Sequence, residues 1–179
     1  MRHALPLALW GLLALPAAAA ASGCDGRRHG DAANPTRRAA ARATPDGGLP
    51  SGEVVLRSPG RPEVRVRIEF ATDRRDIERG LMFRERLDPD AGMLFVFPPP
   101  ARRHVFWMRN TIVPLDMIFI ADDLQVVGVV ENAEPLTETE RAVGAPSRYV
   151  LEVNAGFAAR HGVAAGTRVE VIGLDDGVR

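Results

Sequence analysis

The stretch LDMIFIADDLQVVGVV, residues 115–130, decides the fold class of this 179-residue chain. Apolar residues occupy most positions on both sides of the pair Asp122-Asp123, which is typical of a turn. Strands that are apolar at successive positions are buried on both faces. The stretch therefore predicts a β-hairpin, with strands over Leu115–Ala121 and Leu124–Val130, in the middle of a two-layer structure.

Short strands are predicted on both sides of this hairpin. Val64, Val66, Ile68 and Phe70 alternate with charged residues, the period-two pattern of a strand with one buried face. Similar or fully apolar runs predict further strands over 54–57, 93–97, 104–109, 149–154 and 167–172. Two short helices are expected over 74–79 and 155–160. Thr72 or Asp73 can cap the first and Asn154 the second, and Gly80 and Gly162 suit their ends.

About eight strands and two helices place residues 53–179 in a single β-rich domain. The expected fold class is mainly β, an antiparallel β-sandwich or barrel, with an α+β fold as the alternative. We find no strand-helix-strand alternation that would predict a parallel sheet.

Residues 1–23 have the pattern of a secretory signal peptide. Arg2 supplies a positive charge, an apolar run extends over 4–15, and Pro16 is followed by small residues. The run is shorter than the ~20 apolar residues that a spanning helix needs. We therefore expect export rather than a transmembrane segment.

Cys24, the chain's single cysteine, directly follows Ala21-Ser22-Gly23. This arrangement resembles the bacterial lipoprotein signal, in which the cysteine is acylated and the chain is cut before it. We expect Cys24 to anchor the protein to the periplasmic face of a bacterial membrane. Ordinary cleavage after the alanine run, which would leave a soluble periplasmic protein, is the alternative.

Residues 24–52 separate this cysteine from the domain. The segment is rich in Ala, Arg, Gly and Pro and holds hardly any large apolar residue. Such a composition buries too little surface to offset the entropy of ordering. We expect a disordered tether behind the lipid anchor.

Charge and composition exclude several classes of function. The 23 basic and 23 acidic side chains balance, which argues against a nucleic-acid partner. All basic residues are arginines, so lysine Schiff-base chemistry and a Walker-type phosphate loop are excluded. One cysteine allows no intrachain disulfide. No histidine spacing indicates a metal site, and we expect neither metal nor cofactor.

Five blocks, in order, carry a resemblance to a known family: Gly80-Leu81-Met82, Gly92-Met93-Leu94-Phe95, Phe106-Trp107-Met108-Arg109-Asn110-Thr111, Pro114-Leu115-Asp116 and Glu152-Val153-Asn154-Ala155-Gly156. The chain resembles the domain of unknown function 192 family over residues 53–173. The resemblance implies a mainly β domain and brings no reaction, substrate or cofactor. Arg109 departs from the family pattern, which more often has lysine.

The candidate site lies around the loop from Trp107 to Asp116. Period two places Trp107 and Arg109 on one face, and Asn110 favours a turn. Asp116 starts an apolar strand, and burying a carboxylate without partners is costly. It either accepts hydrogen bonds from the backbone of 110–114 and fastens that loop, or it lines a ligand pocket with the other three residues and Glu152.

These residues support three functional hypotheses for an exported domain without a recognisable catalytic constellation. The first is a ligand-binding or accessory module of the cell envelope, whose ligand is a small molecule, glycan or envelope protein. The second is a hydrolase of envelope glycan that uses Asp116 and Glu152, which requires the two carboxyl groups to flank one bond. The third is a protein-protein adaptor with an exposed apolar patch.

Overall fold

A computed structural model describes residues 48–175 of the chain. The predicted signal peptide, Cys24 and nearly all of the predicted tether lie outside the described residues. Neither helix within 48–175 has the length and apolar composition needed to cross a bilayer.

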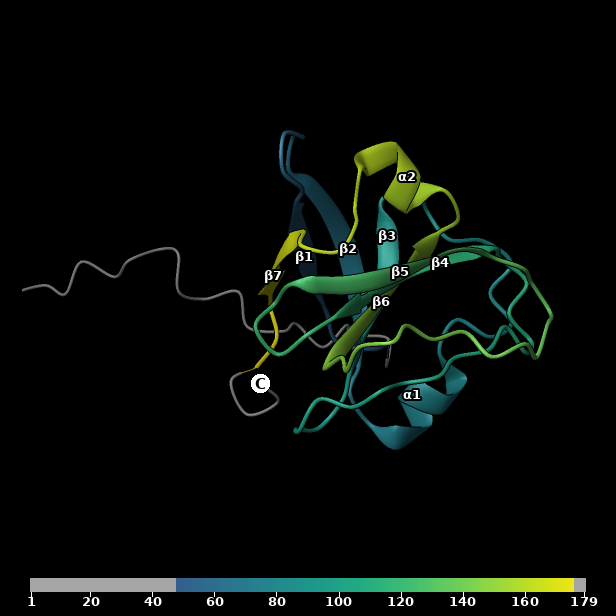
Figure 1. Cartoon of the computed structure of the whole chain (residues 1–179). Coiled ribbons are helices and arrows are strands. Elements are labelled where there is room, and N and C mark those ends of the chain that lie inside the picture. Colours follow the sequence, from purple (N-terminus) through teal and green to yellow (C-terminus); the bar gives the residue numbers. More distant parts are fainter. Residues whose placement is uncertain (1–47, 176–179) are drawn as a thin grey trace, which may run out of the picture. The chain divides into compact units, whose positions relative to one another are not determined.

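Seven strands and two short helices build the domain, and Figure 1 shows α1 and α2 at opposite ends of the sheet. In chain order the elements are β1 (Ser51–Arg57), β2 (Val64–Ala71), α1 (Arg74–Arg79), β3 (Ala91–Val96), β4 (Leu115–Ile120), β5 (Val126–Ala133), β6 (Tyr149–Asn154), α2 (Phe157–His161) and β7 (Arg168–Ile172). The strands form one sheet in the order β5-β4-β6-β3-β2-β1-β7. The prediction of a mainly β domain with two short helices is confirmed.

The sheet curls into a half-barrel, so that its two edge strands, β5 and β7, meet at one end. Val126 N donates to Thr167 O at 2.9 Å, and Val169 N donates to Leu124 O at 2.8 Å. An isolated bridge joins Gln125 to Arg168 at the same place. Backbone groups that would be unpaired at two sheet edges are therefore satisfied locally by one another.

Each face of the sheet carries its own apolar cluster, because the strands alternate their side chains between the two faces. The inner cluster draws residues from all seven strands, including Phe70, Leu94, Ile118 and Leu151. The outer cluster, on the opposite face, contains Met93, Phe95, Met117, Phe119 and Val150. The predicted central hairpin exists as β4 and β5, and every residue of β4 is buried.

One strand pair is parallel, which the sequence analysis did not predict. β2 pairs with β3 in parallel, with Phe70 opposite Leu94, and the connection between them runs through α1. Parallel neighbours require a crossover of about a dozen residues or more. The segment 72–90 provides that length, but its helix is too short to produce a clear strand-helix-strand pattern in the sequence.

The predicted strand over 104–109 is not formed. Phe106 makes an isolated bridge to Arg141, with both backbone hydrogen bonds at 2.8 Å, and no longer ladder extends from it. The segment instead lies over the outer cluster, where Phe106 and Met108 pack inward and Trp107 is exposed. The side chains of this segment do alternate between the core and solvent, as the sequence pattern indicates. A strand also needs a neighbouring strand with which to pair, and the pattern does not provide one.

The predicted capping residues are found at three of the four helix ends, although α2 begins two residues later than predicted. Asp73 caps α1 by accepting a hydrogen bond from Asp76 N, Gly80 ends it, and Gly162 ends α2 in the left-handed conformation. Asn154 does not cap α2. Its side-chain amide donates to the carbonyls of Leu87 and Asp88 instead.

Gly92 in β3 has no room for a side chain. A Cβ atom there would lie 2.5 Å from the backbone oxygen of Glu152 on the neighbouring strand. Overpacking of this kind costs about 1–3 kcal/mol. We expect Gly92→Ala to lower the free energy of unfolding by about 2 kcal/mol in urea denaturation.

Gly144→Ala is the matched control, since a Cβ atom there meets nothing within 4 Å. We expect it to change the unfolding free energy by less than about 0.5 kcal/mol. Equal effects at the two glycines would contradict the packing argument.

Candidate functional site

A cleft of about 550 Å³ lies on the outer face of the sheet. Its lining comes from the end of α1 and the residues after it (77–82), from Phe95 and Phe97, from the segment 104–107, and from Thr111 and Glu152. Clefts of roughly 300–1,000 Å³ are typical of small-molecule sites. The cleft therefore has the size and position of a ligand site.

Glu152 and Thr111 are the two buried polar residues of this cleft, and Glu152 is the ionisable one. It lies on central strand β6, directly opposite Met93 of β3 and Met117 of β4. Only 5% of its surface is accessible, and within residues 48–175 no hydrogen bond or ion pair reaches its carboxyl group, which opens onto the cleft. Burial raises the pKa of Glu152 to about 8, because the apolar surroundings disfavour the charged form.

Aromatic rings build the wall beside Glu152. The Phe106 ring meets the Phe95 ring edge-on, with centroids 5.1 Å apart, and meets Phe119 in the same way at 6.0 Å. His104 stacks on Phe97, with ring centroids 3.6 Å apart. Edge-to-face and stacked contacts of this kind hold rings in defined orientations, so the wall is preorganised.

His104 contributes its imidazole ring to this wall. Burial lowers the pKa of His104, a hydrogen bond with the Ser147 backbone opposes this shift, and the nearby Arg102 lowers the pKa further. Its Nε2 atom is buried without a hydrogen-bond partner in the described part of the chain. The histidine and the glutamic acid of the cleft are thus both held toward their neutral forms.

The rim of the cleft is apolar and partly charged. Trp107 and Val105 expose 51% and 45% of their surfaces. Glu78 and Arg79 of α1 also lie at the rim, and Glu78 is paired with Arg74 at 2.7 Å. The cleft thus combines an exposed indole ring with the buried Glu152.

The structure brings together two of the five predicted site residues, Trp107 and Glu152. Arg109 is exposed outside the cleft, with its nearest acidic partner, Glu138, at 3.6 Å. Asn110 occupies a turn with φ of 56° and does not line the cleft. Of the five predicted residues, only Trp107 and Glu152 line the cleft, so the structure does not bring the predicted set together.

Asp116, the fifth predicted residue, is completely buried and bound to the backbone. Its Oδ1 accepts hydrogen bonds from Asn132 N at 2.8 Å and Gly156 N at 3.1 Å, and its Oδ2 accepts one from Ala158 N at 2.8 Å. The expectation of a fastening role was therefore right in kind but wrong in its partners, which come from β5 and the start of α2 rather than from 110–114.

Asp116 and Glu152 lie on opposite faces of the sheet. Met117 is directly opposite Glu152 and shares its face, so the preceding residue, Asp116, points to the other side. Two carboxyl groups separated by a sheet cannot flank one glycosidic bond. The arrangement required by the predicted glycan hydrolase is absent for this pair.

The sequence analysis missed the α1 side of the cleft. Residues 77–82 line it together with Phe95 and Phe97, and His104 was treated as structural. The motif Gly80-Leu81-Met82 was the one available signal, since it lies at this wall. The motif lines a cleft only because α1 packs close to the segment 104–107, and local sequence patterns do not show this contact.

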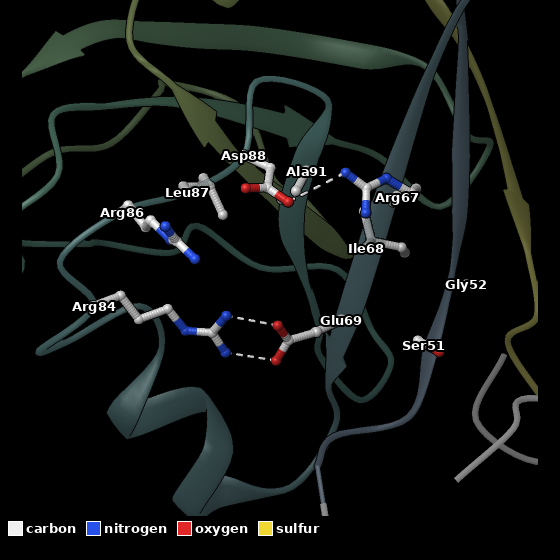
Figure 2. A pocket seen from close by; sticks show the side chains of 11 residues that line it. Ser51, Gly52, Arg67, Ile68, Glu69, Arg84, Arg86, Leu87, Asp88 and Ala91 are labelled. Carbon is white, nitrogen blue, oxygen red and sulfur yellow. Dashed lines mark hydrogen bonds and ion pairs between the residues drawn. The ribbon is translucent and has the colours of Figure 1, made fainter. Parts of the chain in front are cut away.

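A second hollow, of about 500 Å³, lies beside β2 (Figure 2). Arg84 forms a two-bond pair with Glu69, with one contact at 2.6 Å, and Arg67 pairs with Asp90 at 2.6 Å. Figure 2 shows the two hydrogen bonds between Arg84 and Glu69 crossing this hollow. Arg86 also lines this hollow and makes no ion pair within residues 48–175, but its side chain is exposed, unlike that of Glu152 in the first cleft.

An exposed apolar group surrounds the turn at 110–112. Phe83 and Leu136 each expose 65% of their surface and adopt positive φ, and Ile112 is 47% exposed. Backbone hydrogen bonds from Phe83 N to Asn110 O and from Leu136 N to Thr111 O hold them at the turn. Nothing in the described residues covers this group. Within the same residues, no cluster of three or more His, Cys, Asp or Glu side chains is placed to hold a metal ion.

Comparisons with known proteins agree on the fold and supply no activity. The chain is similar to a Sinorhizobium meliloti 1021 protein provisionally described as a transcription regulator, with 40% identity, a TM-score of 0.67, and coverage of 71% of this chain and 98% of that one. It is also similar to a protein of unknown function from Novosphingobium aromaticivorans DSM 12444, with 38% identity, a TM-score of 0.66, and coverage of 71% and 89%. No curated protein matches the chain.

A family model matches residues 54–171, which includes all seven strands in whole or in large part. The five sequence blocks that carried the resemblance fall within this range. The chain belongs to the family DUF192, described as uncharacterized ACR, domain of unknown function 192.

Proposed function

We propose that this protein is an exported binding module that holds a small ring-containing ligand in the cleft between Glu152 and Trp107. The observation that carries the proposal is the Glu152 carboxyl group, which is buried at the centre of the sheet with no partner within residues 48–175. A buried polar group without a hydrogen bond costs stability. A ligand that pairs with it would remove that cost in the bound state.

The surroundings of Glu152 support a ligand with a flat apolar body. The wall of Phe95, Phe97 and Phe106 is rigid, and Trp107 offers a half-exposed ring at the rim. Aromatic rings provide large contact areas at low entropic cost. This combination of one polar group and several aromatic rings is typical of sites that bind small molecules.

A nuclear magnetic resonance titration tests the cleft. Trp10 and Trp107 are the two tryptophans of the chain. Trp10 lies in the predicted signal peptide, and Trp10→Phe removes its signal from any uncleaved chain, so this variant gives a single indole N–H signal from Trp107. We expect phenol, as an uncharged ring probe, to shift this signal in a saturable way. The shift should be competed by other ring compounds that enter the cleft.

A pair of variants on the same background shows where the probe binds. Val105→Ala removes a rim contact of the cleft and should weaken phenol binding about threefold or more, since a buried methylene contributes ~0.8 kcal/mol. Ile112→Ala shortens an exposed apolar side chain outside the cleft and should leave the affinity unchanged. Equal weakening by both variants, or no saturable shift, would contradict the proposal.

We also propose that Cys24 is acylated after export and holds the domain at the periplasmic face of a bacterial membrane. The support is the sequence around Cys24, with its charged start, apolar run and small residues before the cysteine. Acyl chains contribute ~0.8 kcal/mol per buried methylene, so two or more chains give stable anchoring. The tether would then place the cleft within reach of the membrane surface.

Metabolic labelling with palmitate in a bacterial host tests the anchor. We expect the wild-type chain to incorporate the label and to pellet with membranes, and Cys24→Ser to do neither, because no other cysteine is present. Release of unlabelled wild-type protein with the soluble periplasmic fraction would contradict lipidation while leaving export intact. Retention in the cytoplasm would contradict both.

The adaptor hypothesis is kept as a second candidate because of the exposed group around 110–112. Phe83, Ile112 and Leu136 expose large apolar side chains, and bulky residues at positive φ are uncommon. Backbone conformations of this kind concentrate at functional sites. Capture of a specific envelope protein that is lost in Phe83→Ser but kept in Val105→Ala would favour this surface over the cleft.

A further inference from the structure

The groups that face Glu152 determine which ligand chemistry the cleft can satisfy. From the two flanking strands it meets Met93 and Met117, which are uncharged. From the segment 104–107 the titratable group is His104, whose pKa is lowered by burial. From α1 the cleft has Glu78, paired with Arg74, and the exposed Arg79. No cation is paired with Glu152 among the described residues.

An organic cation fits these surroundings poorly. It would have to approach past Arg79 at the rim, and like charges repel at short range in a partly buried site. It would also require Glu152 to ionise next to two methionines, against the cost of burying a charge. The cleft thus favours a ligand that is uncharged where it meets the acid.

We propose that the cleft takes an uncharged planar ligand that carries a hydrogen-bond acceptor next to a donor, an amide-type group that pairs with both carboxyl oxygens of Glu152. This inference rests on the proposed function and specifies its ligand class. A protonated carboxyl group has one O–H donor and one carbonyl acceptor side by side. An amide with its C=O and N–H on the same side matches both at once.

The pairing satisfies both oxygens of Glu152 and both polar groups of the ligand amide. The Glu152 hydroxyl donates to the ligand carbonyl, and the ligand N–H donates to the other Glu152 oxygen. The raised pKa of Glu152 supports this arrangement, because its carboxyl group keeps its proton at neutral pH. The flat body of the ligand would lie against the aromatic wall and the indole of Trp107.

The test compares two probes that differ by one hydrogen-bond donor. 2-Pyridone has a carbonyl beside an N–H, whereas N-methyl-2-pyridone lacks the donor, and both are planar and uncharged. With the indole signal of Trp107 in the Trp10→Phe chain as readout, we expect 2-pyridone to bind about tenfold more tightly, since an unmet buried hydrogen bond costs about 1–3 kcal/mol. Its affinity should fall as the pH rises through about 8.

Variants at Glu152 separate the protonated acid from a charged one. The Gln side chain has a donor beside an acceptor, so Glu152→Gln should keep the 2-pyridone affinity within about threefold at pH 6 and lose the pH dependence. Glu152→Leu removes both groups and should weaken binding about tenfold or more. Glu78→Gln, at the rim, is the matched control and should retain the wild-type pH profile.

The possible outcomes distinguish this inference from the proposed function. Saturable phenol binding with equal affinities for the two pyridones would overturn the amide pairing and leave the cleft as a binding site. Preferential binding of benzyltrimethylammonium, strengthening as the pH rises, would overturn it in favour of an ionised Glu152. If none of the probes shifts the Trp107 signal, the inference and the proposed function both fail. The pH profile of the wild-type protein needs no substitution at Glu152, so misfolding of a variant cannot obscure the answer.

Discussion

Asp116→Ala is expected to lower the free energy of unfolding by about 4 kcal/mol. The carboxylate accepts hydrogen bonds from the backbone N–H groups of Asn132, Gly156 and Ala158, and it is completely buried. Removing it leaves three amide groups without their partner, and each unsatisfied buried group costs about 1–3 kcal/mol, reduced where water can enter. Urea denaturation followed by circular dichroism measures the change.

Asp116→Asn should have a smaller effect, because its amide oxygen still accepts while its NH₂ group faces a donor. Asp88→Ala is the control, since this aspartate is exposed and its contact with Arg67, at 3.4 Å, is a surface ion pair. We expect the control to lower the unfolding free energy by less than about 1 kcal/mol. A similar small loss for Asp116→Ala would show that the carboxylate does not join β5 and α2 to β4.

The unfolding free energy of the wild-type protein, measured relative to Glu152→Gln, is expected to fall by about 4–5 kcal/mol between about pH 4.5 and pH 8. The carboxyl group has a pKa of about 8 in the folded protein, against an ordinary value of 4.5 for a glutamate side chain. Between these values the unfolded chain releases the proton while the folded chain keeps it. Rising pH therefore stabilises the unfolded state, by about 1.4 kcal/mol per pH unit.

Above the folded-state pKa, Glu152 is ionised in both the folded and the unfolded state. The difference in unfolding free energy between the two proteins should therefore no longer change with pH. Comparing the two proteins at each pH cancels the titration of the exposed acids, which both share. Glu85→Gln is the matched control, since this glutamate is exposed, and it should give a flat difference across the range. A flat difference for Glu152→Gln would contradict the burial of an unpartnered acid.

The two acids illustrate opposite relations between burial and stability. Asp116 is buried with three donors and stabilises the junction of three elements. Glu152 is buried without any partner in the described part of the chain and destabilises the fold at neutral pH. Sites that bind ligands often contain groups that reduce stability, a pattern that Glu152 follows and Asp116 does not.

Local patterns determined most of the secondary structure. The central hairpin, the alternating strand at 64–70 and the Asp73 cap follow from periodicity and side-chain chemistry within short windows. The same patterns placed Trp107 and Arg109 on one face, and both side chains are exposed in the structure, although no strand forms there. Burial preference is a local property of the chain, whereas a strand also needs a neighbour.

The sequence by itself thus determined a mainly β domain and the family to which it belongs. It also selected Glu152 and Trp107 as residues of interest. Only the tertiary structure decided that Asp116 and Glu152 lie on opposite faces of the sheet, because that depends on how β4 and β6 are registered. It alone decided that α1 closes one side of the cleft and that Glu152 has no partner there, since hydrogen bonding between distant segments is set by packing and leaves no trace in local periodicity.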